Sequence, residues 1–111
     1  LKFNKKIFIQ PLKYKFAKNI FWVFGVVLRK DSKIKREKIT KMLSAKGIQT
    51  RNFFYPMHKQ KIFKKMKLFS KRIKYPNAEF LSQNGFYLPS GLGIKNNEIS
   101  YISRILNKIL K

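Results

Sequence analysis

The chain has 111 residues, 44% of them hydrophobic and 15% aromatic, which is enough for one hydrophobic core and too few for a two-domain enzyme. It contains no cysteine and one histidine, so a disulfide framework, a thiolate zinc site and a multi-histidine metal cage are excluded. The 4 acidic residues are far apart in the sequence, which argues against a catalytic carboxylate pair or a calcium site.

The 27 lysines and arginines give a net charge of +23. So basic a chain suggests binding to nucleic acid or to an anionic membrane, and predicts nonspecific polyanion binding that salt weakens. A/T-rich codons offer a second explanation, because the amino acids that they encode (Phe, Tyr, Met, Ile, Asn and Lys) make up 62 of the 111 residues. Only five of the cations are arginine, the residue best suited to bidentate phosphate contacts.

The N-terminal sequence lacks an apolar segment of signal-peptide length. The longest apolar run, residues 20–28, is far shorter than the roughly 20 residues that cross a bilayer. We therefore expect a cytoplasmic protein with no membrane span. The chain starts with leucine, which suggests either the tail of a longer protein or a gene with an unusual start.

Two strands are expected first. Residues 6–12 are β-branched and aromatic, and Pro11 restricts them to a short edge strand or an extended arm. Residues 19–28 are apolar on both alternating faces, which is typical of a buried central strand. We expect Trp22 to lie in the core and Gly25 to allow a neighbouring element to pack closely.

A helix over residues 36–46 is predicted next, with Gly47 as its left-handed C-terminal cap. Lys35 stands at the N-cap position, where lysine cannot accept a hydrogen bond, so this helix start is expected to fray. A third strand candidate spans residues 48–55 and stops at Pro56.

Three more helices and a strand follow in the pattern. A short helix is expected over residues 58–66, another from Pro76 to a C-terminal cap at Gly85, a strand over 86–89 and a turn over 90–93. The clearest amphipathic helix covers residues 96–110. This order predicts an α/β or α+β fold in which helices pack on one short, mostly antiparallel sheet.

Three ordered blocks carry the most specific signal: the Thr-Arg strand at 50–51 with the Tyr-Pro-x-His corner at 55–58, Tyr-Pro at 75–76, and Leu-Pro-Ser-Gly at 88–91. Together with the preceding helix and Gly47, they resemble the C-terminal domain of DegT/DnrJ/StrS-type sugar aminotransferases, and within that family the perosamine synthases. The resemblance covers about residues 19–110. The glycines at 85–93 match no phosphate-binding fingerprint.

The resemblance implies the small C-terminal domain of the aspartate-aminotransferase-type fold, which uses pyridoxal 5'-phosphate (PLP). It would divide the chain into an N-terminal arm at 1–18 and the small domain at 19–111. The large domain, which carries the Schiff-base lysine and binds the cofactor, would be absent, so no cofactor is expected for this chain alone. The intact enzyme would move an amino group from glutamate to a 4-keto-6-deoxy sugar nucleotide, and its partners would be the large domain and a second subunit.

The resemblance also implies that Arg51, Tyr55 and His58 line the substrate side of the cleft, while no catalytic residue or metal ligand is expected in this chain. Arg51 could bind a carboxylate or a phosphate through its planar group, or be one surface cation among many. His58 could bind the sugar, or simply start a helix after Pro56. Two alternatives to a transaminase fragment stay open: a basic nucleic-acid-binding module and an inactive remnant.

Overall fold

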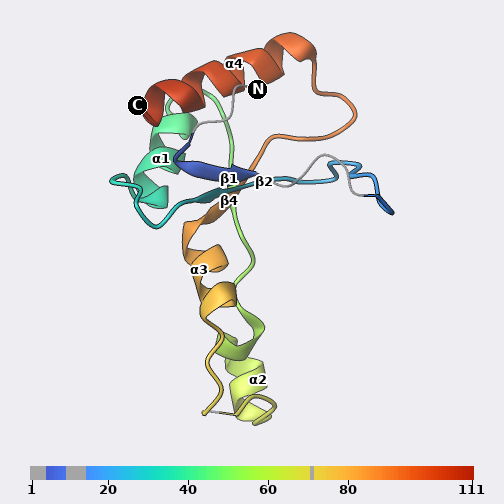
Figure 1. Cartoon of the computed structure of the whole chain (residues 1–111), viewed down its shortest axis with the longest axis vertical. Coiled ribbons are helices and arrows are strands. Elements are labelled where there is room, and N and C mark those ends of the chain that lie inside the picture. Colours follow the sequence, from blue (N-terminus) through green and yellow to red (C-terminus); the bar gives the residue numbers. More distant parts are fainter. Residues whose placement is uncertain (1–4, 10–14, 71) are drawn as a thin grey trace.

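The structure is a computed structural model that describes residues 5–9, 15–70 and 72–111. In this part of the chain, four strands form one antiparallel sheet in the order β1-β2-β4-β3 (Figure 1). The strands are β1 (Ile7–Ile9), β2 (Phe24–Leu28), β3 (Arg51–Asn52) and β4 (Gly85–Leu88). The predicted mixed α/β fold with an antiparallel sheet is confirmed.

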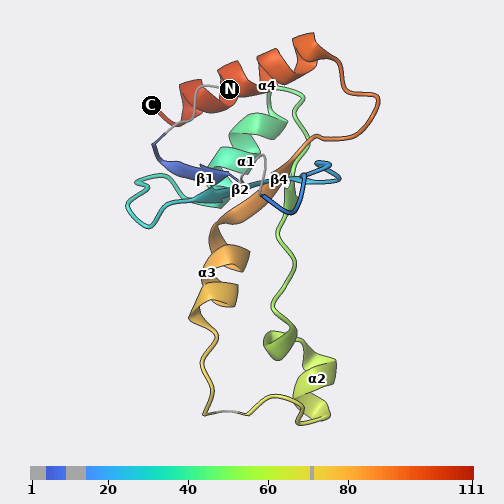
Figure 2. The same cartoon turned by 45° about the vertical axis from the view of Figure 1, so that its right-hand side comes forward.

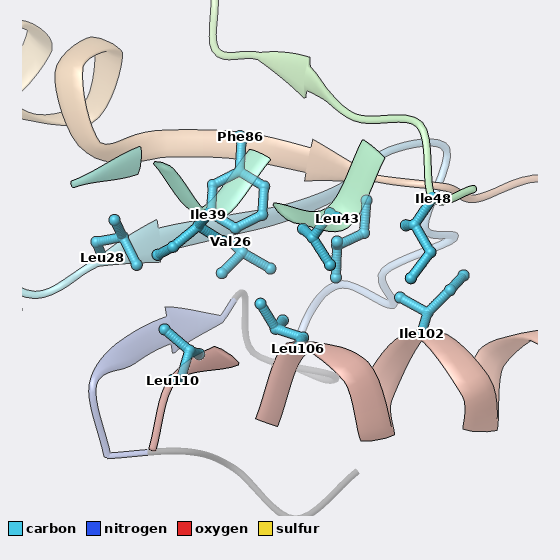
Figure 3. Packing of buried hydrophobic residues seen from close by; sticks show 10 residues of the cluster. Val26, Leu28, Ile39, Leu43, Ile48, Phe86, Ile102, Leu106 and Leu110 are labelled. Atoms are coloured by element: carbon cyan, nitrogen blue, oxygen red, sulfur yellow. The ribbon is translucent and has the colours of Figure 1, made fainter. Parts of the chain in front are cut away.

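Helices α1 (Arg36–Ser44) and α4 (Asn96–Ile109) cover one face of this sheet (Figure 2). Alternation along β2 and β4 sends Val26, Leu28 and Phe86 toward these helices, where Leu106 and Leu110 meet them (Figure 3). Each of these five side chains is at most 5% exposed, so the core lies between the sheet and the two helices.

Strand β1 pairs only with β2 among the described residues and is therefore an edge strand, as the sequence predicts for this region. Ile7 lies opposite Leu28 in that ladder. Pro11, on which the expectation partly rested, lies outside the described residues.

The end of α1 follows the predicted glycine cap. Gly47 has φ +73°, and the amide of Ile48 donates to the carbonyl of Leu43 at 3.0 Å while the amide of Gly47 donates to Ser44 at 2.9 Å. These two bonds form a Schellman motif, which turns the chain from α1 toward β3. Ile48 and Leu43 are both buried, so the turn is closed by an apolar contact.

The N-terminus of α1 lacks a side-chain cap, as expected from Lys35, and the N-terminus of α4, at Lys95, lacks one too. Lys95 donates its backbone amide to the Glu98 carboxylate at 2.7 Å. The Lys95 ammonium has no lone pair to accept an amide in return, so only half of a capping box can form.

Of the two expectations for residues 19–28, the one for Gly25 is confirmed and the one for Trp22 is wrong. Gly25 is buried and allows the Phe53 ring to approach closely, as predicted. The expectation that Trp22 lies in the core is wrong, because its side chain is 77% exposed. Strand β2 starts only at Phe24, opposite Leu88, and Phe21 takes a left-handed conformation with φ +51°, so the residues before Phe24 leave the sheet.

The expected strand over residues 48–55 is also too long. Only Arg51 and Asn52 form β3, because they pair with Tyr87 and Phe86 while β4 starts at Gly85 and offers few further partners. The helix expected at 58–66 is divided into a 3₁₀ turn, η1 (Met57–Lys59), and α2 (Lys61–Lys65). Helix α3 (Pro76–Asn84) starts at the predicted proline.

The segment from Phe54 to Tyr75, here called the arm, extends away from the sheet (Figure 1). It carries η1 and α2, and α3 leads from it back to β4. The radius of gyration is 16.0 Å, whereas a compact domain of this length would have about 13 Å. The arm therefore adds little to the core and is held by contacts of its own.

Candidate functional site

A groove of about 780 Å³ opens where the end of β4 meets α1 and the start of β3. Strands β2 and β3 flank β4 on its two sides, so residues before β2 and residues of β3 face each other across the end of β4. The groove is lined mainly by polar and basic side chains, among them Lys41, Gln49, Thr50, Arg51, Asn52 and Ser90. We call it the Arg51 groove.

Arg51 is exposed, and it belongs to a strand only two residues long that pairs with β4 at Tyr87. The next residue fixes this strand: Phe53 donates its amide to the carbonyl of Gly85 at 3.1 Å, and its ring stacks on Tyr87 with centroids 4.6 Å apart. The Arg51 guanidinium is therefore carried on an anchored backbone while its side chain stays accessible to an anion.

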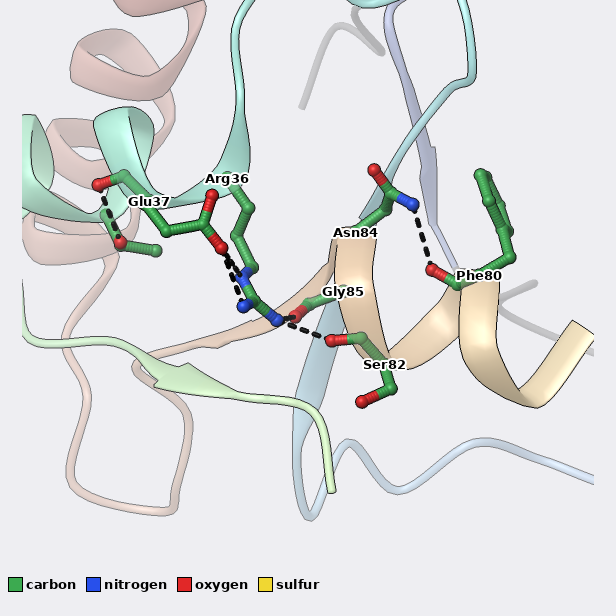
Figure 4. Close-up of polar contacts among 7 residues, drawn as sticks. Arg36, Glu37, Phe80, Ser82, Asn84 and Gly85 are labelled. Carbon is green, nitrogen blue, oxygen red and sulfur yellow. Dashed lines mark hydrogen bonds and ion pairs between the residues drawn. The ribbon is translucent and has the colours of Figure 1, made fainter. Parts of the chain in front are cut away.

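A partly buried arginine joins the groove wall to α3 and β4. The Arg36 side chain is 13% exposed, and its guanidinium donates to the backbone carbonyls of Ser82 and Gly85 (Figure 4). It also donates to the Glu37 carboxylate, 2.8 Å from Nη2. These bonds connect the first turn of α1 with the end of α3, and so position the helix that forms one side of the groove.

Glu37 is the acidic residue that lines the groove among the described residues. Its own backbone amide and then the Arg36 guanidinium donate hydrogen bonds that lower the pKa of its carboxyl. It is ionised at neutral pH, but Arg36 offsets its charge. Lys41 and Arg51 then leave the groove with a net positive charge, which suits an anionic ligand.

Tyr55 and His58 lie outside the Arg51 groove. Because β3 ends at Asn52, the alternation of side chains along the strand does not extend from Arg51 to Tyr55. Tyr55 is 60% exposed at the base of the arm, and its carbonyl accepts a 3.4 Å hydrogen bond from Gln60. The substrate-binding roles of these two residues stay predictions.

His58 is embedded in the arm. Its imidazole stacks on Tyr75 with centroids 4.6 Å apart, and its Nε2 lies 3.2 Å from the Glu79 carboxylate. Lys59 donates to the other oxygen of that carboxylate at 2.7 Å. Hydrogen bonds from Lys59 and then His58 lower the pKa of Glu79. This cluster ties η1 to α3 and stabilises the arm, a function that the lone histidine in the sequence could not reveal.

The described residues do not form a PLP site by themselves. A Schiff-base lysine needs a desolvated position beside the cofactor, and the pyridinium nitrogen needs a carboxylate partner. No lysine in the described part of the chain is buried, and Glu37 is 67% exposed and bound to Arg36. Any cofactor would have to be held by residues that this part of the chain does not supply.

The structure adds two findings on other classes of site. Within residues 5–9, 15–70 and 72–111, no three histidine or acidic side chains gather as metal ligands would. Among the helices described, none combines the length and the apolar character needed to cross a membrane.

Comparison with known proteins gives consistent results. The model of the DegT/DnrJ/EryC1/StrS aminotransferase family matches residues 2–107. Over 98 residues, the chain is 31% identical to a GDP-perosamine synthase of Escherichia coli O157:H7, covering 86% of this chain and 25% of that protein. The chain thus spans about a quarter of the length of this relative.

Solved structures show the same fold. A GDP-4-keto-6-deoxymannose-3-dehydratase (ColD) variant with bound GDP-perosamine superposes with a TM-score of 0.75 at 20% identity, over 91% of this chain and 26% of that one. An E. coli GDP-4-keto-6-deoxy-D-mannose-3-dehydratase with bound hydrated PLP gives a TM-score of 0.66 at 21% identity, over 91% and 25%.

Proposed function

Because the chain belongs to the DegT/DnrJ/EryC1/StrS aminotransferase family, we propose that it forms the small C-terminal domain of a PLP-dependent sugar-nucleotide aminotransferase of the perosamine synthase type. In this proposal residues 19–111 are the domain proper, and residues 1–18 are an extended N-terminal segment, distinct from the arm at residues 54–75. The intact enzyme transfers an amino group from glutamate, through PLP, to a 4-keto-6-deoxy sugar nucleotide.

The Arg51 groove is the observation that carries the proposal. It presents Arg51 and Lys41 together with amide and hydroxyl groups, the chemistry that binds the phosphates and hydroxyls of a sugar nucleotide. The chain binds and orients this substrate in the proposal, while PLP, held by the large domain, supplies the electron sink for amino transfer. Tyr55 and His58 are proposed to approach the sugar from the arm.

A second, apolar groove of about 640 Å³ is the proposed contact with the large domain. It lies between α4, the end of β4 and the residues before β2, and its lining includes Ile20, Trp22, Leu92 and Ile99. Ile20 is 85% exposed and Leu92 is fully exposed. Large apolar side chains that are exposed to solvent side by side are typical of an interface with another domain or protein. The chain alone is therefore expected to bind a hydrophobic dye and to associate as its concentration rises.

A chimaera tests the substrate role. The chain is joined to the large domain of a related aminotransferase, and kcat/KM for the keto sugar nucleotide is compared with that of Arg51→Ala, Arg51→Lys, Tyr55→Phe and His58→Ala forms. Loss of a charged hydrogen bond to substrate predicts a decrease of about 10- to 150-fold for Arg51→Ala, partly restored in Arg51→Lys.

The matched control is Arg104→Ala, which removes an exposed arginine of α4 that lines neither groove. It should leave kcat/KM unchanged. A folded Arg51→Ala chimaera as active as this control would contradict the assignment of the groove to substrate. No detectable transfer by any folded chimaera would instead favour the inactive remnant.

A further inference from the structure

The outer part of the arm combines positive charge with exposed apolar side chains. Residues 54–75 contain eight lysines and arginines and no acidic residue. Glu79, the acidic residue nearest in the sequence, is already bound by Lys59 and His58. Among the cations that the structure describes here, six are exposed: Lys61, Lys64, Lys65, Lys67, Arg72 and Lys74. Four apolar side chains between them are each 55–58% exposed: Ile62, Met66, Leu68 and Ile73. We call these ten residues the arm tip.

The fold of the arm places its aliphatic side chains on the outside. Ile62 and Met66 are four residues apart at the end of α2, where the amide of Met66 donates to the carbonyl of Ile62 at 3.0 Å, so they share one face of the helix. The aromatic rings form the interior instead. Phe63 packs edge-on against Phe69 with centroids 6.2 Å apart, and Phe69 packs in the same way against Tyr75 at 5.9 Å.

The turn after α2 resembles the turn after α1 but lacks the features that stabilise it there. The amide of Leu68 donates to the carbonyl of Phe63 at 3.2 Å, which is the same hydrogen bond that closes the α1 turn. Lys67 has φ +54°, a left-handed conformation that Gly47 takes after α1 without strain. Leu68 is 58% exposed, whereas Ile48, at the equivalent position, is buried. The turn thus holds an apolar side chain in water on a strained backbone.

The arm tip is remote from both grooves. Figures 1 and 2 place α2 and α4 at opposite ends of the longest dimension of the molecule, which is 48 Å. Helix α4 borders the apolar groove, and no described residue of the arm lines that groove or the Arg51 groove. The contact proposed for the large domain therefore does not account for the exposed side chains of the arm tip.

We propose that the arm tip binds reversibly to the surface of an anionic lipid bilayer. Lysine carries its charge on a flexible apolar stem, so it can reach the headgroup phosphates while neighbouring aliphatic side chains enter the acyl boundary. Charge alone would suit nucleic acid equally well, but aliphatic side chains gain nothing from a phosphate backbone. A basic cluster together with apolar side chains provides the two attractions that membrane anchoring requires. The proposal is independent of the substrate role of the Arg51 groove.

Co-sedimentation with vesicles tests the contribution of charge. The 111-residue chain is mixed with vesicles of phosphatidylglycerol and phosphatidylcholine, or of phosphatidylcholine alone, and should bind only the anionic ones. At physiological ionic strength a charge acts over about 8 Å, so cations far from the bilayer contribute little. Lys64→Gln/Lys65→Gln should therefore weaken binding by about 10- to 30-fold. The matched control Lys33→Gln/Lys38→Gln removes two exposed lysines near α1 and should weaken it by less than about twofold.

A second pair of variants tests the apolar contact without changing the charge. Leu68→Ser/Ile73→Ser should weaken binding to the anionic vesicles by about 10-fold or more. Its control, Ile20→Ser/Leu92→Ser, removes exposed apolar side chains of the other groove and should leave binding unchanged. Circular dichroism of each variant establishes that it is folded.

Tryptophan emission locates the contact. Trp22 is the one tryptophan in the chain and lies outside the arm, so its emission should not shift when the chain binds vesicles. In Trp22→Phe/Ile62→Trp the one indole lies on α2 instead, and its emission should shift to shorter wavelength as the arm tip enters the bilayer.

Four results would overturn the proposal. Equal losses in the two lysine pairs would show that net charge alone attracts the chain. A shift of Trp22 emission, with Leu68→Ser/Ile73→Ser still binding, would place the apolar groove at the bilayer. Loss of vesicle binding when the chain is joined to a large domain in the chimaera would show that the arm tip is covered in the intact enzyme. Finally, if the folded chain ignores anionic vesicles but binds DNA, the arm tip contacts nucleic acid, while the role of Arg51 in the chimaera is tested separately.

Discussion

Replacing Gly85 by alanine should destabilise the chain by forcing apart the contacts that anchor β3. A Cβ at Gly85 would lie within 3.0 Å of the Phe53 ring and of the Leu81 carbonyl. The carbonyl belongs to α3 and cannot move without disturbing the helix. Gly85 has φ −93°, so the glycine is required by the space around it and not by a left-handed conformation.

The size of the effect follows from these contacts. Forcing an extra methyl group into a packed site costs about 1–3 kcal/mol, and a clash with both an aromatic ring and a backbone oxygen indicates the upper part of that range. For a domain of this size we expect a decrease in Tm of roughly 10 °C. Gly25→Ala should cost less, because its Cβ would meet side-chain atoms and no backbone atom, the nearest being the tip of the Phe53 ring at 3.0 Å.

Gly93→Ala is the matched control. Nothing lies within 4 Å of its Cβ position, so the unfolding free energy should change by only about 0.5 kcal/mol, in the stabilising direction if at all. Urea titration followed by circular dichroism measures all three variants. A Gly85→Ala chain as stable as Gly93→Ala would refute the packing argument, and lack of coupling between Gly85→Ala and Phe53→Leu in a double-mutant cycle would show that the Phe53 ring is not involved.

Three further predictions concern charge. Lys35→Ser should raise the unfolding free energy by about 1 kcal/mol, because the N-cap position has extended backbone and no side-chain acceptor, and Lys33→Ser is the control outside the helix. The pKa of Glu79 is lower in the folded chain than its ordinary value of 4.5, so the ionised carboxylate stabilises the fold at pH values above 4.5. This stabilisation is lost as the pH falls through the pKa of the folded state. The unfolding free energies of the chain and of Glu79→Gln should thus converge in acid, and a constant difference down to low pH would contradict the role of this carboxylate. The chain should bind unrelated DNA duplexes with no sequence preference, and the logarithm of the binding constant should fall linearly with the logarithm of the salt concentration. Tight, sequence-selective binding near physiological salt would instead favour a nucleic-acid-binding module.

Sequence patterns predicted most of the regular elements because their signals are local. The periodicity of residues 96–110 anticipated α4, Pro76 marked the start of α3, and Gly47 marked the left-handed turn after α1. The length of β3 depended on information that is not local: a strand continues only while its partner does, and β4 offers four residues. His58 shows the same limit, since its contact with Glu79 joins residues 21 positions apart.

Trp22 is where the local pattern fails most clearly, and the failure has a physical explanation. An apolar run around a tryptophan predicts burial, yet the left-handed Phe21 and the Ser90 hydrogen bond take the indole out of the sheet. The structure that a segment prefers locally usually agrees with the structure that it takes in the fold. Exceptions concentrate at functional sites, where backbone strain is retained because a ligand or partner compensates for it. In this chain the exception borders the groove that contains Arg51. A strained backbone, an exposed aromatic ring and a cluster of positive charge therefore coincide, although each arises from a different segment of the sequence.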